Sequence, residues 1–241
     1  LFGEGESSIA PPLAMVEALP WSDHERLQHE KTALGFYLSG HPFTTYSREF
    51  SNVVRNSLSR LSPPPPEEPM RSVIIGGVVE SLRFQNTQSG RMMVLMLSDG
   101  TGSQEVTVYS EVFDAHRDIV KEDAVLFIEA RIRAFRRGGE DGDGGIAMRI
   151  AAERLYDVAG ARARFSRGLR LSMNGEANSQ KLKQMLAPYR SGACPVAIDY
   201  RNGTARCELW LGDEWRITPD DRLVRSLREW LKPENVQFVY P

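Results

Sequence analysis

Arginines and aromatic residues recur together at two places in the middle of the sequence. The first group is Arg83, Phe84, Asn86, Gln88 and Arg91, and the second is Arg131, Arg133, Phe135, Arg136 and Arg137, followed by Arg149. Arginines neutralise backbone phosphates and aromatic rings stack on bases, which together permit sequence-tolerant binding of a single nucleic-acid strand. The pattern predicts such a site. The alternative is that these arginines form a solvated rim or pack on a neighbouring domain.

Residues suited to hydrolysis or metal binding are scattered. The four histidines stand far apart, with no Cys or carboxylate at ligand spacing. Asp141-Gly142-Asp143 begins like a calcium loop, but Ile146 and Ala152 occupy the positions where such a loop needs Gly and Glu. Phosphate-binding GxxxxGK and nucleophile GxSxG patterns are both missing from the sequence. We therefore expect no catalytic residue, no metal site and no cofactor.

The composition predicts a globular cytoplasmic protein without a membrane anchor. Hydrophobic residues make up 41% of the 241 residues, and the formal net charge is −2. No apolar run approaches the ~18 residues that span a bilayer, and no basic-then-apolar leader opens the sequence. Two cysteines fit a reducing compartment. The length suits roughly two domains of ~100 residues each.

The elements that must position the arginines belong to a mixed fold. Residues 1–20 are rich in Gly, Glu, Ser, Ala and Pro, which is typical of a linker or tail. Residues 21–62 are expected to form a helical segment that opens with the capping-box spacing of Ser22 and Glu25. Four consecutive prolines make residues 63–70 a stiff, extended spacer, which we expect to be the clearest domain boundary.

Residues 71–158 are expected to form a five-stranded OB-fold barrel. Strands are expected at 73–79, 92–97, 104–109, 125–132 and 146–156, with a short helix at 111–120. A helix between the third and fourth strands and paired glycines in the first are typical of this fold, which binds oligonucleotides. Its net charge is −3, but we expect the arginines to gather at one opening of the barrel and the acids around the helix.

Residues 159–241 are expected to form a small α/β domain with a net charge of +5. Asn202-Gly203 predicts a hairpin, and Thr218 is the expected N-cap of the following helix. The expected hairpin register sets Cys207 opposite Ile198 and Cys194 opposite Leu211, so we expect no disulfide and two small core residues. The final strand, 236–240, is an edge that a protein partner could use. The candidate partner contacts are Trp215, Val236, Phe238 and Tyr240.

One block of the sequence resembles a specific family. EKTALGFYLSGHP at residues 30–42 is similar to the segment that precedes the OB domain in bacterial replicative DNA polymerase III alpha subunits. The resemblance continues through LSDGTGSQEVTVY (residues 97–109), RSGACPV (190–196) and WRITPDDRL (215–223), and so spans nearly the whole chain. An error-prone relative shares the OB domain but is not expected to carry the last domain, so the final third favours the replicative enzyme.

The resemblance implies a non-catalytic C-terminal region of a DNA-directed DNA polymerase, because the metal-binding aspartates belong to another part of that subunit. It implies that the barrel binds single-stranded template and that the last domain binds the tau subunit of the clamp loader. Leu1-Phe2-Gly3 looks like the end of a clamp-binding peptide, which implies weak or absent binding to the sliding clamp. The competing hypothesis is a structural scaffold that packs on the polymerase body without touching DNA.

Overall fold

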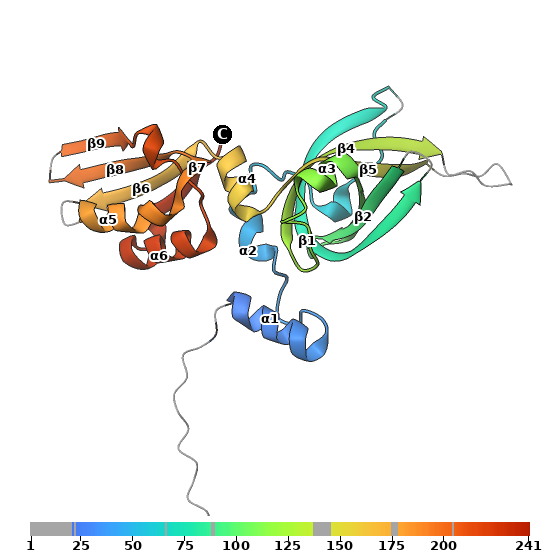
Figure 1. The fold of residues 1–241 in the computed structure, drawn as a ribbon, viewed down its shortest axis with the longest axis horizontal. Helices are drawn as coiled ribbons and strands as arrows, with labels where there is room; N and C mark the ends of the chain where they lie inside the picture. The colour runs from blue at the N-terminus through green and yellow to red at the C-terminus, as the bar shows by residue number, and fades with distance from the viewer. Residues whose placement is uncertain are drawn as a thin grey trace, which may run out of the picture. The chain divides into compact units, whose positions relative to one another are not determined.

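A computed structural model describes residues 21, 23–65, 67–87, 90–136, 146–174, 178–203 and 205–241 (Figure 1). The chain divides into two compact units, residues 1–40 and residues 41–241. Each unit is described by itself. Over the described residues, no helix is both long and apolar enough to cross a membrane.

The described part of the first unit is built around α1 (Asp23–Leu34). The helix ends at Leu34 rather than at Gly40, and Gly35 follows it with a φ of +82°, a conformation that glycine adopts without steric cost. The Glu30 carboxylate then accepts hydrogen bonds from the backbone N–H groups of Leu38 and Ser39, both at 2.8 Å. These bonds turn the chain back along the helix. Ser22, the expected capping residue, lies outside the described residues.

Residues 41–62 pack on the barrel and form little helix. Only α2 (Thr44–Ser47) and the 3₁₀ turn η1 (Leu58–Arg60) are helical. Phe50 is fully buried with its ring centroid 4.1 Å from that of Phe127, and Leu58 lies in the barrel's own core. The boundary between compact units therefore falls at Gly40–His41 and not at the proline run. The prolines keep the chain locally extended, but the apolar side chains that precede them determine that residues 41–62 pack on the barrel.

The second unit contains the closed barrel that the sequence predicts. Its elements are β1 (Met70–Thr87), β2 (Gly90–Ser98), β3 (Ser103–Tyr109), α3 (Ser110–Ala115), β4 (Val125–Arg136) and β5 (Ile146–Tyr156). The strand order around the barrel is β1-β2-β3-β5-β4, and every pairing is antiparallel except that of β3 with β5. This is the OB-fold, with α3 between the third and fourth strands as expected.

The paired glycines of β1 serve close packing. A Cβ at Gly77 would collide with the carbonyl oxygen of Ser98 on β2, and one at Gly76 would lie 2.6 Å from the ring of Phe43. A register shift follows between Val79 and Ser81, where β1 stops pairing with β4 and continues beside β2. The bulge lets a single long strand serve both neighbours in the barrel.

Asp99 closes the hairpin between β2 and β3 and ties it to the segment before the barrel. Its carboxylate accepts hydrogen bonds from the N–H groups of Leu58 (2.8 Å), Thr101 (2.8 Å) and Gly102 (3.2 Å) and from the Thr101 hydroxyl (2.7 Å). Burial raises the pKa of Asp99, but these donors outweigh that effect and hold the pKa below its ordinary value. Asp99 therefore stabilises the folded state as a carboxylate.

We expect Asp99→Ala to lower the free energy of unfolding by about 2 kcal/mol, since hydrogen bonds to a charged acceptor are worth roughly 1.5–3 kcal/mol. Because the folded-state pKa is depressed, this contribution is complete above the unfolded-state pKa of about 4 and is lost as the pH falls through the folded-state value. Urea unfolding at pH 7 and pH 3 measures both effects. A wild-type protein and an Asp99→Ala variant that lose equal stability between these pH values would contradict the assignment.

The C-terminal part of the second unit is an α/β domain. It contains α4 (Val158–Phe165), β6 (Gly168–Asn174), α5 (Ser179–Leu186), η2 (Ala187–Tyr189), β7 (Arg190–Cys194), β8 (Val196–Asn202), β9 (Ala205–Trp210), η3 (Asp213–Trp215), α6 (Asp221–Leu231), η4 (Pro233–Asn235) and β10 (Val236–Val239). The sheet order is β10-β6-β8-β9, with β6 and β8 parallel. Helices α5 and α6 lie together beside this sheet (Figure 1).

Three local expectations for this domain are wrong. The hairpin forms as predicted, but Asn202 is the last residue of β8 and pairs with Ala205, and Cys207 pairs with Tyr200 rather than with Ile198. Both cysteines are free, and Cys207 is exposed, so only Cys194 is a core residue. The N-cap of α6 is Asp220, whose carboxylate accepts from the Arg222 N–H at 2.7 Å, and not Thr218. The two adjacent acids that follow the proline are further candidates for the N-cap of α6, and the sequence pattern does not distinguish between the candidates.

A buried arginine joins the two parts of the second unit. Arg162 on α4 is 2% exposed and forms a bidentate ion pair with Glu49 (2.7 and 3.0 Å) and another bond to Asp221 (2.7 Å). Tyr46 and Tyr240 donate their hydroxyl hydrogens to Asp221 and Glu49. Burial, together with these carboxylates, raises the pKa of both phenols well above the ordinary value. The network links residues 41–62, α4, the start of α6 and the chain after β10.

Candidate nucleic-acid interface

The predicted arginines of β4 point outward because the strand alternates. Arg131, Arg133 and Phe135 are exposed, whereas Ile132 between them is fully buried in the barrel. Successive strand residues face opposite sides, so the three share one wall. The register then sets Arg149 of β5 opposite Arg133. Arginines from two neighbouring strands therefore meet on the outer wall of the barrel.

The same wall continues across the other strands. Arg131 pairs with Ala151 on β5, Ala151 with Thr107 on β3, Thr107 with Val94 on β2, and Val94 with Arg83 on β1. Tyr109, two residues beyond Thr107 and 47% exposed, faces the same way. We call these side chains the outer-wall cluster: Arg83, Tyr109, Arg131, Arg133, Phe135 and Arg149.

The cations of the cluster differ in how far they are already neutralised. Arg83 pairs with Glu105 at 2.6 Å and Arg131 with Glu153 at 2.5 Å. Within the described ranges, no carboxylate forms an ion pair with Arg133 or Arg149. Arg149 instead lies over the Phe135 ring, 5.3 Å from its centroid, and the Arg133 Nε donates to the Met70 sulfur at 3.4 Å. These two guanidinium groups are the ones most available to an anion.

A hollow in the wall lies between these groups. It has a volume of about 440 Å³ and is lined by Tyr109, Val112, Arg131, Arg133, Arg149, Ala151, Ala152 and Glu153. Three arginines thus converge on one depression with an exposed phenol at its edge. Binding of a single strand requires guanidinium groups that hold the phosphates and, next to them, rings that stack on the bases.

The structure does not bring every predicted residue to this place. Phe84 follows Arg83 directly and therefore faces the other side of β1, where its ring meets Phe113 of α3 edge-on at 5.3 Å. Asn86 is exposed near the end of the described part of β1. Gln88 and Arg137 lie outside the described residues. Arg91 and Arg136 lie in β2 and β4, but their side chains are not described.

Tyr109 belongs to the cluster but was not predicted. The sequence places it at the last position of β3, directly before the helix, where an aromatic residue is equally common in a core. A signal was present, because Glu105, Thr107 and Tyr109 alternate with the buried Val106 and Val108. If the alternating pattern of β3 is followed to the last residue of the strand, it predicts that Tyr109 faces outward.

The four candidate partner contacts are largely occupied within the chain. Val236 is 1% exposed in the core of the C-terminal domain, and the half-buried ring of Phe238 lies under the Arg162 guanidinium at 5.1 Å. Tyr240 packs on Phe50, with ring centroids 5.3 Å apart, and Trp215 is covered by Arg190 at 4.5 Å. Strand β10 does form one edge of the sheet, as expected.

The opposite edge of that sheet is more open. All six residues of β9 are exposed, including the large apolar side chains of Leu209 (51%) and Trp210 (55%). The sequence did not single out this strand, because an alternating pattern predicts one buried face. Exposed apolar side chains on an edge strand are typical of a protein-binding surface.

The closed five-stranded barrel with a cationic and aromatic wall defines the class: residues 73–158 match the model of an OB-fold nucleic acid binding domain. Residues 181–231 match the model of the DNA polymerase III subunit alpha C-terminal domain. The chain belongs to the DNA polymerase III subunit alpha family and corresponds to its C-terminal region.

Relatives from two bacteria illustrate this membership. The DNA polymerase III subunit alpha of Vibrio cholerae is 32% identical over 225 residues, which are 91% of this chain and 19% of the relative. That of Neisseria meningitidis serogroup A is 31% identical over 240 residues, 98% of this chain and 20% of the relative. The chain therefore spans about a fifth of the length of these relatives.

Among solved structures, the mitochondrial single-stranded DNA binding protein Rim1 of Saccharomyces cerevisiae aligns with 36% of this chain and 91% of its own. The sequence identity is 18% and the TM-score is 0.31.

Proposed function

We propose that this chain is the non-catalytic C-terminal region of a replicative DNA polymerase subunit and that its barrel holds single-stranded template DNA during chromosomal replication. The observation that supports the proposal is the outer-wall cluster, in which Arg133 and Arg149 lie beside Phe135 and Tyr109 with no acid to neutralise them among the described residues. The proposed DNA contacts also include Arg83, Phe84, Asn86, Gln88, Arg91, Arg136 and Arg137. The intact polymerase would act in the cytoplasm.

Binding of fluorescent oligo(dT) to the chain, followed by anisotropy over a salt series, tests this function. Each phosphate contact on a single strand contributes about −0.7 to the slope of log K against log salt. Engagement of the four described arginines of the cluster gives a slope of about −3. A chain that binds no oligo(dT) at low salt would contradict the proposal and leave the scaffold hypothesis, in which the barrel only packs on the polymerase body.

We further propose that the C-terminal domain is the part that binds the tau subunit of the clamp loader. The open β9 edge, with Leu209 and Trp210 exposed, supports a protein-binding role for this domain. Trp215, Val236, Phe238 and Tyr240 remain proposed contributors, through the packing that holds β10 and the domain together. Sliding-clamp binding through Leu1-Phe2 is proposed to be weak, and those residues lie outside the described ones.

The Leu209→Ala/Trp210→Ala double variant is expected to weaken tau binding by at least tenfold, because exposed aromatic anchors dominate interfaces. Thermal stability should change little, since both side chains are more than half exposed. Calorimetric titration of the variant with purified tau, next to a Gln237→Ala control on the opposite edge, measures the effect. If the double variant binds tau with wild-type affinity and Gln237→Ala weakens tau binding, the tau site lies on β10 and not on β9.

A further inference from the structure

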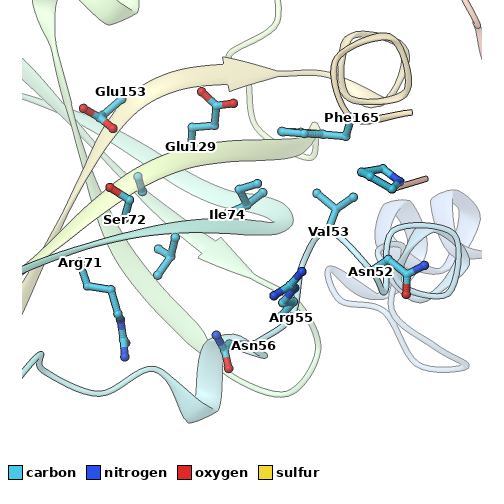
Figure 2. A pocket seen from close by; sticks show the side chains of 13 residues that line it. Asn52, Val53, Arg55, Asn56, Arg71, Ser72, Ile74, Glu129, Glu153 and Phe165 are labelled. Atoms are coloured by element: carbon cyan, nitrogen blue, oxygen red, sulfur yellow. The ribbon is translucent and has the colours of Figure 1, made fainter. Parts of the chain in front are cut away.

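A second hollow lies beside the outer-wall cluster. It has a volume of about 650 Å³ and runs between residues 52–56 and the outer wall formed by β1, β4 and β5 (Figure 2). We call it the side groove. In Figure 2, Arg55, Asn56 and Arg71 lie on the lower side of the groove, and Glu129 and Glu153 lie on the upper side.

The groove is lined by two arginines and two glutamates, but both glutamates are already engaged by other arginines. Glu129 is paired with Arg164 at 3.2 Å and Glu153 with Arg131 at 2.5 Å, and neither of these arginines lines the groove. No carboxylate in the described parts of the chain pairs with Arg55 or Arg71. The two guanidinium groups of the lining are therefore uncompensated, which favours an anionic occupant.

Arg71 has a donor that the folded chain leaves unused. Its Nη2 donates to the Ser62 carbonyl at 3.3 Å, whereas its Nε is buried and has no hydrogen-bond acceptor among the described residues. Buried polar groups of native proteins almost always have a partner. Of the five N–H donors of a guanidinium, Arg71 uses one on Ser62, which leaves terminal N–H groups to donate to an anionic oxygen that enters the groove.

The side groove is continuous with the outer-wall cluster. Glu153 lines both hollows, and its ion-pair partner Arg131 belongs to the cluster. The register sets Ser72 of the groove directly opposite Arg131. A chain that leaves the cluster across β4 therefore enters the groove after crossing a single strand spacing of about 4.8 Å.

We propose that the side groove binds the continuation of the same single DNA strand, with its phosphates at Arg55 and Arg71. This inference rests on the proposed function and adds the route of the strand. The groove is also lined by the half-buried ring of Phe165 and the amides of Asn52 and Asn56, which suit stacking and hydrogen bonding to splayed bases. Continuity with the cluster favours nucleic acid over an acidic peptide.

Oligo(dT) of two lengths tests the route, because a single OB-fold covers between about 4 and 16 nucleotides. An oligonucleotide of about 6 residues fits on the cluster alone, and one of about 16 residues also reaches the groove. The Arg55→Ala/Arg71→Ala variant is expected to bind the short oligonucleotide like the wild type. It should bind the long one roughly 25-fold more weakly at 0.1 M salt, since two lost contacts remove about 1.4 from the salt slope.

Arg55→Glu serves as a second variant, because Arg55 is exposed and its replacement leaves Arg71 and the barrel packing in place. It should also weaken only the long oligonucleotide. Arg117→Ala/Arg225→Ala removes the same charge elsewhere and should change neither affinity.

The outcomes separate the two proposals. If the wild type binds neither oligonucleotide, the proposed function fails. If the wild type binds both and the groove variants match it on the long one, the route is wrong while the function stands. If the groove variants lose both lengths equally, the groove is part of the primary site and not a continuation. If a poly-glutamate peptide binds in an Arg55-dependent way and does not compete with the long oligonucleotide, the groove is a peptide site and the inference is overturned.

Discussion

Arg162→Met is expected to lower the free energy of unfolding of the second unit by about 3 kcal/mol. Removing one partner of a buried ion pair typically costs 3–5 kcal/mol because the remaining charge is left without compensation. Glu49 is 15% exposed and loses two bonds, whereas Asp221 is 44% exposed and regains water, so the lower end of that range applies. For a unit of about 200 residues this corresponds to a melting temperature lower by roughly 6–12 °C.

Differential scanning calorimetry of the whole chain measures the effect. Arg117→Met is a matched control, because the Arg117–Asp114 pair is 68% and 61% exposed and such pairs contribute less than about 1 kcal/mol. We also expect the Arg162→Met transition to broaden or split, since Arg162 connects Glu49, which packs with the barrel, to Asp221 of the C-terminal domain. A variant that melts within 1 °C of the wild type would show that the network is dispensable.

The second large effect is expected from the triple variant Arg133→Ala/Phe135→Ala/Arg149→Ala. Loss of two phosphate contacts removes about 1.4 from the salt slope, equivalent to roughly 25-fold in affinity at 0.1 M salt. Loss of a stacking ring adds roughly 1–3 kcal/mol for the base that it held. Affinity for oligo(dT) should therefore fall by more than about 100-fold, while the melting temperature changes little because all three side chains are exposed.

The matched control for the triple variant removes two arginines from other surfaces, as Arg117→Ala/Arg225→Ala. If the losses were due only to net charge, both variants would weaken binding equally. A triple variant with wild-type affinity would exclude the outer wall as the binding surface and favour a scaffold role for the barrel.

The barrel could be predicted because its signals are local and agree with one another. Alternation along residues 125–136 separates Arg131 and Arg133 from Ile132, and the turn at Asp99 separates two strands that pair without a register shift. The Asn202-Gly203 hairpin was predictable for the same reason. Its register was wrong by two residues, since the dipeptide indicates that a hairpin forms but does not determine how many residues close it.

The features that depend on distant contacts could not be predicted. Arg162 lies in the sequence ARARF, where an arginine looks solvent-exposed, and its partner Glu49 is 113 residues away. Arg83 and Phe84 were grouped by proximity in the sequence, but neighbours in a strand point to opposite sides. The side groove is formed by residues 52–56, which sequence reasoning assigned to a helix and not to the barrel wall.

Crosslinking of a single strand to the barrel tests the central proposal most directly. Oligo(dT) containing 5-iodouracil is bound to the whole chain at low salt and irradiated, and the crosslinked peptides are then located by mass spectrometry. If template DNA lies on the outer wall, the crosslinks will be found at Tyr109 and Phe135, and they will disappear in Arg133→Ala/Arg149→Ala. Crosslinks confined to the C-terminal domain, or none in a sample that binds the oligonucleotide, would contradict the account.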